Sequence, residues 1–437
     1  MIAITAPASK SMSHRMLIGA ALARGESVLR HVLQSDDITR TRRILCAAGA
    51  HMEDLPDGGL RVRGVAGLPR GADLAGTEAL SCDVHESGST CRFLTAVLAA
   101  GQGRFRVHGA ARMHERPIGA LTAVLETLGA SVRWEGRSGR PPFTLETRGL
   151  QGGRVEIGLE ESSQYLSALL LAAPLCRAPL IIALGGTHAV SRPYVGLTLQ
   201  TLENFRVPFE LWEDADGRRA DWRSPAEAAP GKLCFHMRPA AYTAGEFRVE
   251  GDWSGASYFL AAGAVGKAAV RVEGLRGDSL QGDRALVDIL RRMGARVDED
   301  EDCVTVHPSR LCGIDADMGS CPDLAPTVAV LAAFAQGATT IRNAAHLRIK
   351  ESDRIAAPAA NLRAAGIAVQ EREDGLHIEG GTPQPAPLFH SFGDHRIAMS
   401  AAVLGLPHGP VRLDAPEVVA KSFPAFWELW EKVLVGA

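Results

Sequence analysis

Two short segments of this sequence place cations and carboxylates within a few residues of one another. They are Lys350–Arg354, which reads Lys-Glu-Ser-Asp-Arg, and Asp394–Arg396, which reads Asp-His-Arg. Arginine binds carboxylate or phosphate through paired hydrogen bonds, whereas lysine is a compact charge that can also move protons. A helical turn over residues 350–354 would put Lys350 and Arg354 on one face, with Glu351 on a neighbouring face. Glu351 is then either a salt-bridge partner at a helix start or a carboxylate poised for proton transfer.

Other charged residues stand in loops and at the starts of apolar helices. Lys10 and Arg92 fall near two such starts, and Arg116 and Lys421 lie in loops. Helix N-termini carry partial positive charge and free N–H groups, so cations beside them suit phosphate and carboxylate ligands. Asp323 precedes another apolar helix and is either an N-cap or a carboxylate turned toward a substrate.

The elements that must position these residues repeat along the chain. A polar cluster, about three turns of apolar helix, a glycine turn and a β-branched strand recur six times, which predicts an α/β fold with three units per domain. The apolar helices are expected at residues 16–22, 93–100, 166–173, 258–265, 328–335 and 397–404. A second phrase puts Gly49, Gly129, Gly294 and Gly366 at the left-handed position that ends a helix, with a weaker copy at residues 199–207.

Composition favours a globular protein with small partners. The 437 residues are 46% hydrophobic and 22% charged, and the net charge of -3 provides no basic field for nucleic acid or an anionic membrane. Lys10 and Arg15 interrupt the first apolar stretch, so we expect no secretory signal and a cytoplasmic location. The eight cysteines form no Cys-x-x-Cys pair, which predicts reduced thiols and no metal site. Motifs for nucleotide hydrolysis, hydride transfer, zinc proteolysis and serine hydrolysis are missing.

From end to end, the sequence resembles the EPSP synthase family of enolpyruvyl transferases. The matching segments are Ser9–Arg15, Ser87–Arg92, Glu115–Ile118, Ser162–Leu166, Glu250–Asp252, Gln281–Asp283, Pro322–Asp323, Lys350–Arg354, Asp394–Arg396 and Ala420–Pro424. The resemblance implies a two-domain inside-out α/β barrel of six βαβαββ units. Residues 1–8 and 245–437 would form one domain and residues 9–244 the other, with the active site in the cleft between them.

The resemblance also implies a reaction and its residues. The enolpyruvyl group of phosphoenolpyruvate would pass to the 5-hydroxyl of shikimate 3-phosphate, with release of phosphate and no cofactor, as in aromatic amino-acid biosynthesis. Asp323 would be the base and Glu351 the proton donor, assisted by Lys10, His395 and Lys421. The expected ligands of shikimate 3-phosphate are Lys10, Ser11, Arg15, Ser162, Ser163, Gln164, Ser191, Asp323 and Lys350. Those of phosphoenolpyruvate are Lys10, Gly88, Arg116, Gln164, Arg354, Arg396 and Lys421.

Gly88 would leave room for glyphosate beside the enolpyruvate site, and a monomer is expected. The chain departs from common family residues at Glu86, Ser87, His14 and His346.

Two other functions compete with this one. UDP-N-acetylglucosamine enolpyruvyl transferases, which the sequence also resembles, have the same fold but place a reactive cysteine in a mobile loop. The corresponding loop here is Arg112–Arg116, and it contains no cysteine. A non-catalytic anion-binding protein would keep the cations but could lose the carboxylates Asp323 and Glu351, and both are present.

Overall fold

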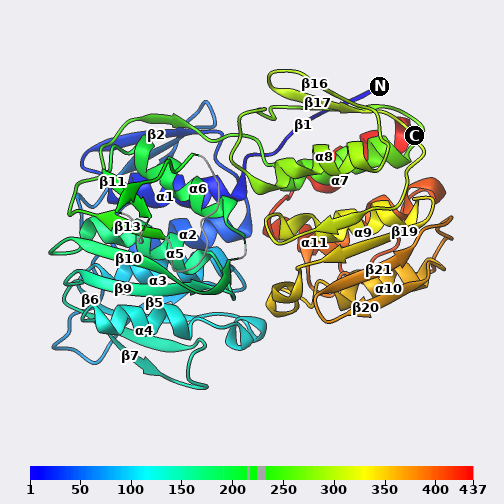
Figure 1. The fold of residues 1–437 in the computed structure, drawn as a ribbon. Helices are drawn as coiled ribbons and strands as arrows, with labels where there is room; N and C mark the ends of the chain where they lie inside the picture. Colours follow the sequence, from blue (N-terminus) through cyan, green and yellow to red (C-terminus); the bar gives the residue numbers. More distant parts are fainter. Residues whose placement is uncertain (190, 214–216, 224–232, 437) are drawn as a thin grey trace. The chain divides into compact units, whose positions relative to one another are not determined.

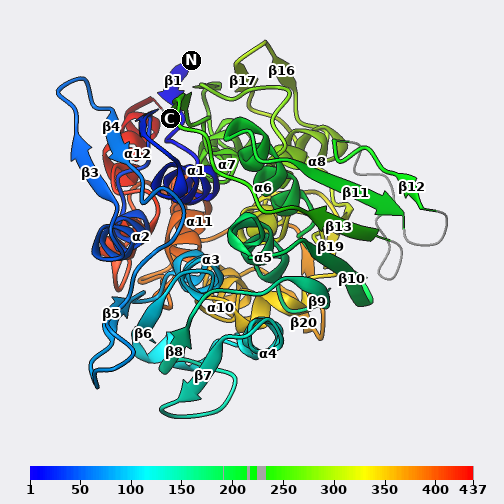
Figure 2. The same cartoon turned by 90° about the vertical axis from the view of Figure 1, so that its left-hand side faces the viewer.

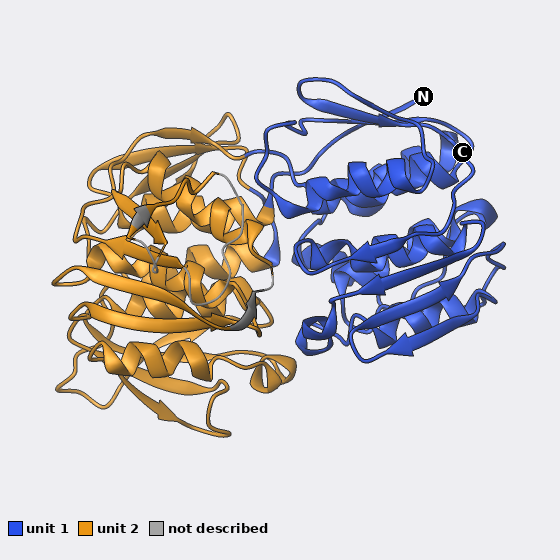
Figure 3. Ribbon diagram, viewed as in Figure 1, with its two compact units in different colours: residues 1–9, 33–36, 250–437 blue, residues 10–32, 37–249 orange. Residues whose placement is uncertain are grey.

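The chain divides into two compact units, each described here by itself. The computed structural model describes residues 1–189, 191–213, 217–223 and 233–436. Unit 1 comprises residues 1–9, 33–36 and 250–437, and unit 2 comprises residues 10–32 and 37–249 (Figure 3). The predicted domain boundaries after residues 8 and 244 lie close to these divisions.

Unit 2 carries the first six α-helices and most of the strands (Figure 1). Its helices are α1 (Lys10–Leu22), α2 (Asp36–Ala47, all but its first residue), α3 (Gly88–Ala99), α4 (Gly119–Thr127), α5 (Gln164–Ala172) and α6 (Pro193–Asn204), with the 3-10 helices η1 (Ala111–Glu115) and η2 (Ala173–Leu175). Its strands are β2 (Glu26–Arg30), β3 (His51–Asp54), β4 (Leu60–Arg63), β5 (Leu80–Asp83), β6 (Gly103–His108), β7 (Ser131–Trp134), β8 (Phe143–Thr147), β9 (Gly153–Leu159), β10 (Leu180–Ala189), β11 (Phe209–Glu213), β12 (Arg218–Arg219), β13 (Leu233–Met237) and β14 (Glu246–Arg248).

Unit 1 repeats the same kinds of element. Its helices are α7 (Trp253–Val265), α8 (Leu286–Arg292), α9 (Ala325–Ala333), α10 (Ala356–Ala364), α11 (His395–Gly405) and α12 (Phe426–Gly436), with η3 (Gly282–Ala285), η4 (Pro322–Leu324), η5 (Ala345–Ile349), η6 (Leu406–His408) and η7 (Pro416–Lys421). Its strands are β1 (Ile2–Thr5), β15 (Val270–Glu273), β16 (Val297–Glu299), β17 (Cys303–Val306), β18 (Asp315–Asp317), β19 (Ala338–Arg342), β20 (Val369–Arg372) and β21 (Gly375–Glu379).

The sheets confirm the predicted repeat. Within the described residues, the strands form four sheets of four strands with one shared topology, and a fifth sheet that adds β12 at the edge of the same arrangement. In the sheet of β5 to β8, β5 pairs parallel with β6, β6 pairs antiparallel with β8, and β7 pairs antiparallel with β8. Helix α3 connects β5 to β6 and helix α4 connects β6 to β7, which gives the order βαβαββ.

Two sheets each contain one strand that is distant in sequence from the other strands of that sheet. β1 pairs parallel with β15 through Ile2↔Val270, although the whole of unit 2 lies between them in the sequence. β14 pairs parallel with β2 through Glu246↔Val28. Each of these strands occupies the position that β5 has in its own sheet, so both sheets complete the repeat with a strand distant in sequence.

The sixth repeat is reduced. Its helix α11 is present, but the strand expected near residues 411–413 contributes only an isolated parallel bridge, Phe389↔Leu413. The following segment continues as η7 and α12 instead of returning as an antiparallel pair.

The first helix of each repeat is buried, and the sheets lie outside these helices (Figure 2). Every residue of α9 and α11 is buried in unit 1, and every residue of α3 except Ser89 is buried in unit 2. Because such helices are apolar around their circumference, their sides serve packing. Their N-terminal ends are the parts left to present polar groups.

Candidate active site

A buried ionic network lies at the starts of α9 and α11 in unit 1, and Arg354 is its centre. The guanidinium of Arg354 donates to Asp394 Oδ2 at 2.7 Å and to Asp394 Oδ1 at 3.1 Å. It also donates to Asp323 Oδ1 at 2.9 Å and pairs with Glu351 Oε2 at 2.9 Å. Three carboxylates from three separate segments therefore meet at one guanidinium.

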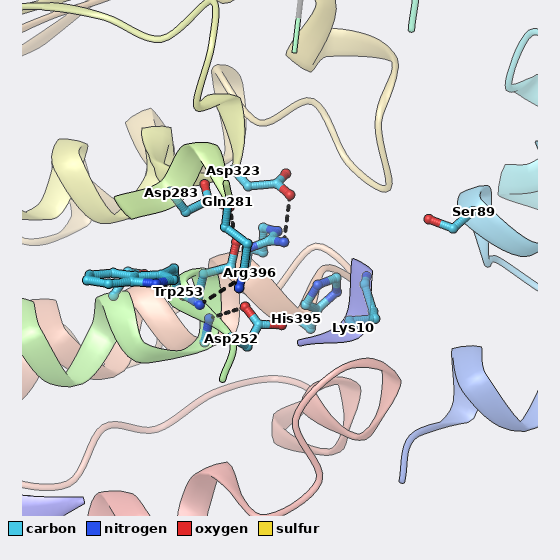
Figure 4. A network of polar contacts seen from close by, with 12 residues as sticks. Lys10, Ser89, Asp252, Trp253, Gln281, Asp283, Asp323, His395 and Arg396 are labelled. Carbon is cyan, nitrogen blue, oxygen red and sulfur yellow. Dashed lines mark hydrogen bonds and ion pairs between the residues drawn. The ribbon is translucent and has the colours of Figure 1, made fainter. Parts of the chain in front are cut away.

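Two further cations complete the network. Arg396 Nη2 donates to Asp323 Oδ2 at 2.7 Å, as the dashed line in Figure 4 shows. Lys421 Nζ lies 4.0 Å from Glu351 Oε1. The Asp323 side chain is 21% exposed, whereas those of Arg354 and Asp394 are 3% and 0% exposed. Asp323 is thus the carboxylate of this network that solvent or a ligand reaches most easily.

The opposite charges of the buried pair Arg354 and Asp394 stabilise each other. Burial opposes the charge on Arg354, but the carboxylates of Asp394, Glu351 and Asp323 raise the pKa of its guanidinium above the ordinary value. Burial likewise opposes the charge on Asp394, and Arg354 holds the pKa of that carboxyl below its usual range. Arg354 and Asp394 therefore stay charged although both side chains are buried.

The prediction of a helical turn over residues 350–354 is wrong. Lys350 has an extended backbone that ends η5, and the next helix, α10, begins only at Ala356. Asp353 Oδ1 accepts hydrogen bonds from the backbone N–H groups of Ile355 and Ala356, both at 3.0 Å, and so starts that helix. Consequently Glu351 is paired with Arg354 and Lys421 and not flanked on a helix by Lys350 and Arg354.

The two alternatives for Asp323 can now be separated. The N-cap position of α9 is Leu324, and it makes no side-chain cap hydrogen bond. The Asp323 carboxylate is instead held by Arg354 and Arg396. The aspartate that caps a helix here is Asp394, whose Oδ1 accepts from the backbone N–H of Arg396 at 2.9 Å. Asp323 is therefore a carboxylate positioned by cations.

Asp283 is a buried acid that the sequence analysis matched within a motif but gave no role. Its Oδ2 accepts a hydrogen bond from Ser254 Oγ at 2.7 Å, and the residue is 2% exposed. Burial, with Asp323 contributing, raises the pKa of Asp283 to about 7. Figure 4 shows Asp283 beside Asp323, close to Gln281. Gln281 Oε1 accepts from the backbone N–H of Trp253 at the start of α7. In the sequence, Asp283 follows Gln281-Gly282 and precedes an apolar helix. This pattern is common in turns, so it indicates no particular role for the aspartate.

Unit 2 gathers a second group of predicted site residues at the starts of α1, α3 and α5. Lys10 Nζ lies 3.4 Å from Asp37 Oδ2, a partner that the sequence analysis missed. Gln164 Nε2 donates to Ser89 Oγ at 3.0 Å, and Gln164 N–H donates to Ser162 Oγ at 3.2 Å. These contacts join the first turns of α3 and α5.

The absence of a side chain at Gly88 allows two arginines to approach the start of α3. A Cβ atom at this position would lie 2.6 Å from Arg116 Nη2 and 2.9 Å from Arg92 Nη1. Arg92 Nη1 donates to the Gly88 carbonyl at 3.3 Å, and Arg116 Nη1 donates to the Glu86 carbonyl at 3.2 Å. Two guanidinium groups therefore converge on one helix N-terminus, an arrangement suited to an anion.

Arg15 stands apart from the other predicted ligands. It is 1% exposed, and it donates to Thr198 Oγ1, the Ser11 carbonyl and the Tyr194 carbonyl, each at 2.8 Å. Burial lowers the pKa of this arginine to about 9. These bonds tie α1 to α6, so Arg15 supports the segment that carries Ser11.

The predicted site residues divide between the two units. Unit 2 holds Lys10, Ser11, Arg15, Gly88, Arg116, Ser162, Ser163, Gln164 and Ser191, and unit 1 holds Asp323, Lys350, Glu351, Arg354, His395, Arg396 and Lys421. Within unit 1 the structure brings together Asp323, Glu351, Arg354, Arg396 and Lys421. His395, which is 1% exposed, lies against Asp394 with Nδ1 3.7 Å from Oδ1.

Comparison with known proteins places the chain in a family. The family model described as EPSP synthase (3-phosphoshikimate 1-carboxyvinyltransferase) matches residues 2–430. The chain belongs to the EPSP synthase family. A 3-phosphoshikimate 1-carboxyvinyltransferase from Methanosphaerula palustris is 41% identical over 98% of this chain and 95% of the relative. One from Nitrosomonas europaea is 39% identical over 97% of this chain and 94% of the relative.

Solved structures agree with this family assignment. An EPSP synthase from Acinetobacter baumannii has a TM-score of 0.76 and 25% identity, covering 99% of this chain and 95% of that one. The enolpyruvyl transferase NikO from Streptomyces tendae has a TM-score of 0.74 at 20% identity, covering 99% and 94%, and thus shares the fold. The predicted two-domain inside-out α/β barrel is therefore confirmed.

The residues that the structure describes contain neither a metal-binding cluster nor a membrane-spanning helix. Among the residues the structure describes, no three His, Cys, Asp or Glu side chains group in a way that would hold a metal ion. None of the described helices is both long and apolar enough to span a membrane.

Proposed function

We propose that this chain transfers the enolpyruvyl group of phosphoenolpyruvate to the 5-hydroxyl of shikimate 3-phosphate and releases phosphate. The observation that carries this proposal is the family match over residues 2–430, in a chain that retains both Asp323 and Glu351 inside a cationic network. A non-catalytic anion-binding protein would have no need to hold two carboxylates so close to the three cations Arg354, Arg396 and Lys421.

Asp323 is the base in this proposal. Its two carboxylate oxygens are held by Arg354 at 2.9 Å and Arg396 at 2.7 Å, so the carboxylate is fixed in direction. Asp323 would take the proton of the 5-hydroxyl while the hydroxyl oxygen bonds to the enol carbon of phosphoenolpyruvate. The partial exposure of Asp323 leaves it accessible for this step.

Glu351 is the proton donor. It would protonate the methylene carbon as the new C–O bond forms, which gives a tetrahedral intermediate. Phosphate then leaves, and loss of a methyl proton regenerates the enol double bond. Arg354 and Lys421 border Glu351, and Lys10 and His395 are proposed to stabilise charge on the reacting groups.

The substrates are bound by cations at helix starts. We assign phosphoenolpyruvate to Lys10, Gly88, Arg116, Gln164, Arg354, Arg396 and Lys421. We assign shikimate 3-phosphate to Lys10, Ser11, Arg15, Ser162, Ser163, Gln164, Ser191, Asp323 and Lys350. The two arginines beside Gly88 support the first assignment, because two guanidinium groups fit a carboxylate or phosphate. A cytoplasmic, monomeric enzyme that needs no cofactor remains our expectation.

The deciding experiment measures phosphate release from phosphoenolpyruvate with two alternative acceptors. Shikimate 3-phosphate should support turnover, whereas UDP-N-acetylglucosamine should not, because the Arg112–Arg116 loop lacks cysteine. Turnover with the nucleotide sugar would instead indicate a UDP-N-acetylglucosamine enolpyruvyl transferase. Binding of both anions without phosphate release would indicate a non-catalytic protein.

A further inference from the structure

A line of buried polar side chains joins the second turns of α1 and α2 to the first turn of α3 in unit 2. His14 Nδ1 lies 2.8 Å from Thr41 Oγ1, and Thr41 Oγ1 lies 2.7 Å from Thr90 Oγ1. Thr90 Oγ1 then donates to Ser87 Oγ at 2.7 Å. None of these four side chains belongs to a residue more than 1% exposed. Polar groups buried so completely are costly unless they are paired, so this line makes a specific demand on the positions of three helices.

The line runs one helical turn behind proposed substrate ligands. His14 follows Lys10 by four residues on α1, and Thr41 follows Asp37 by four residues on α2, which places each pair on one helix face. Lys10 Nζ and Asp37 Oδ2 are 3.4 Å apart in front of the line. On α3, Ser87 is the N-cap that immediately precedes Gly88, and its Oγ accepts from Thr90 N–H at 3.3 Å.

The hydrogen bonds have one consistent direction. Thr90 Oγ1 also lies 3.3 Å from the Asp37 carbonyl, which only accepts. A threonine hydroxyl has a single hydrogen, so Thr90 donates to Asp37 or Ser87, and Thr41 must donate to Thr90. Nδ1 of His14 therefore carries a hydrogen and donates to Thr41.

The imidazole at position 14 is buried in surroundings that keep it neutral. Burial lowers the pKa of His14 to about 3. The negative charge of Asp37 opposes this lowering, and the positive charges of Lys10 and Arg15 add to it. Nε2 of His14 is buried and makes no hydrogen bond to the residues the structure describes. The ring is thus held by its Nδ1 bond alone, which makes that bond the fixed end of the line.

We propose that His14, Thr41 and Thr90 are positioning residues that set where Lys10, Asp37 and the Gly88 end of α3 stand, and thereby the affinity for phosphoenolpyruvate. This inference rests on the proposed function, because it takes Lys10 and Gly88 as ligands of that substrate. The three residues act through others, and none of them is placed against the reacting atoms. Removing the Thr41 hydroxyl would leave the buried Nδ1 of His14 without a partner and take one hydrogen bond from Thr90, which would free α3 to shift relative to α1.

The test replaces Thr41 with valine, which keeps the shape and removes the hydroxyl, and uses Thr41→Ser as the matched control that keeps it. For Thr41→Val we expect the KM for phosphoenolpyruvate to rise about tenfold, which is about 1.4 kcal/mol. The dissociation constant of shikimate 3-phosphate should rise less, by no more than about threefold, because Lys10 is the only one of its proposed ligands among the groups that the line positions. The kcat should also stay within about threefold of that of the unsubstituted enzyme. Thr41→Ser should restore the KM. Melting temperatures of all variants establish that each one is folded.

Thr90→Val provides a second route should Thr41→Val not fold, since it cuts the same line at its other hydroxyl. An unchanged KM for phosphoenolpyruvate in a folded variant would overturn the inference, as would equal losses of affinity for both substrates. So would a failure of Thr41→Ser to restore the KM. These results leave the proposed function intact, because the unsubstituted enzyme still turns over. Absence of turnover in the unsubstituted enzyme would instead refute the proposed function and this inference with it.

Discussion

A substitution of Glu351 can separate a chemical role of its carboxyl group from a purely structural one. Its side chain is 9% exposed and is paired with Arg354 at 2.9 Å. Glu351→Gln keeps size and hydrogen bonding but removes the ionisable proton. If Glu351 donates the proton to the methylene carbon, turnover should fall by about 10²- to 10⁴-fold. Affinity for shikimate 3-phosphate should change little, because its proposed ligands are other residues.

A surface ion pair of the same length provides the control. Glu371 lies 2.9 Å from Arg363 and is substantially exposed. Glu371→Gln should leave turnover unchanged and lower the free energy of unfolding by no more than about 1 kcal/mol. Steady-state turnover and melting temperature, measured on both variants, are sufficient. Near-normal turnover in Glu351→Gln would remove this residue from the catalytic group.

Asp283 should make stability depend on pH in a defined window. Its folded pKa of about 7 lies above the ordinary value of 3.8, because burial and the Asp323 charge disfavour ionisation. Between these two values the folded protein keeps a proton that the unfolded chain has lost. Stability from this group is therefore complete below pH 4 and is lost as the pH rises toward 7, by up to about 1.4 kcal/mol per pH unit. The groups that act on Asp283 are Asp323, Asp252, Arg396 and Ser254.

Asp283→Asn removes this titration. Urea unfolding at several values between pH 4 and pH 8 should show a shallower decline of the free energy of unfolding than in the unsubstituted protein. Asp278→Asn is the control, since Asp278 is exposed and Arg276 lowers its pKa. Parallel pH profiles for Asp283→Asn and the unsubstituted protein would show that Asp283 is already ionised when folded.

At the scale of elements, the repeated helix ends were predictable because they depend on local backbone chemistry. Gly49, Gly129, Gly294 and Gly366 all have positive φ, between 76° and 113°, as the sequence phrase predicted. The weaker copy at residues 199–207 has Arg206 in this place, with φ of 55°. The conformation is thus retained where glycine is missing.

This difference predicts opposite effects of two substitutions. Gly366→Ala should lower the free energy of unfolding by about 1 kcal/mol, because an L-residue is strained at positive φ. Among the described residues, the contacts of the new methyl group within 4 Å are with Gln384, at 3.6 Å and 3.9 Å, so packing contributes little. Arg206→Gly should raise stability by up to about 1 kcal/mol by relieving the same strain. Denaturant unfolding of both variants tests this, and changes of the same sign would contradict it.

Features that depend on distant segments could not be predicted in this way. The pairing of β1 with β15 and of β14 with β2 joins strands separated by more than two hundred residues, and no local pattern specifies it. The segment 350–354 was assigned a helical turn from charge spacing, whereas Asp353 starts a new helix beyond it. Asp394 is the N-cap of α11, and its second role as the most buried partner of Arg354 arises only when three segments fold together.

At the scale of the whole molecule, the proposed ligands are shared unequally between the units. Seven of the nine residues assigned to shikimate 3-phosphate belong to unit 2, and the remaining two are Asp323 and Lys350 in unit 1. Three of the seven residues assigned to phosphoenolpyruvate, Arg354, Arg396 and Lys421, belong to unit 1. The two substrates should therefore protect different segments of the two units from amide hydrogen exchange.

Amide hydrogen exchange with mass spectrometry can measure this protection. Shikimate 3-phosphate alone should slow exchange mainly in unit 2, in peptides from the first turns of α1 and α5, because a ligand that binds the folded state suppresses local opening there. Adding phosphoenolpyruvate should extend slow exchange to the unit 1 peptides that contain Arg354, Arg396 and Lys421. Peptides from β16 and β17 contain no proposed ligand and should stay unchanged in both experiments. Equal protection of both units by shikimate 3-phosphate alone would contradict the proposed division of ligands, and protection confined to unit 2 with both substrates present would exclude the three unit 1 cations from binding.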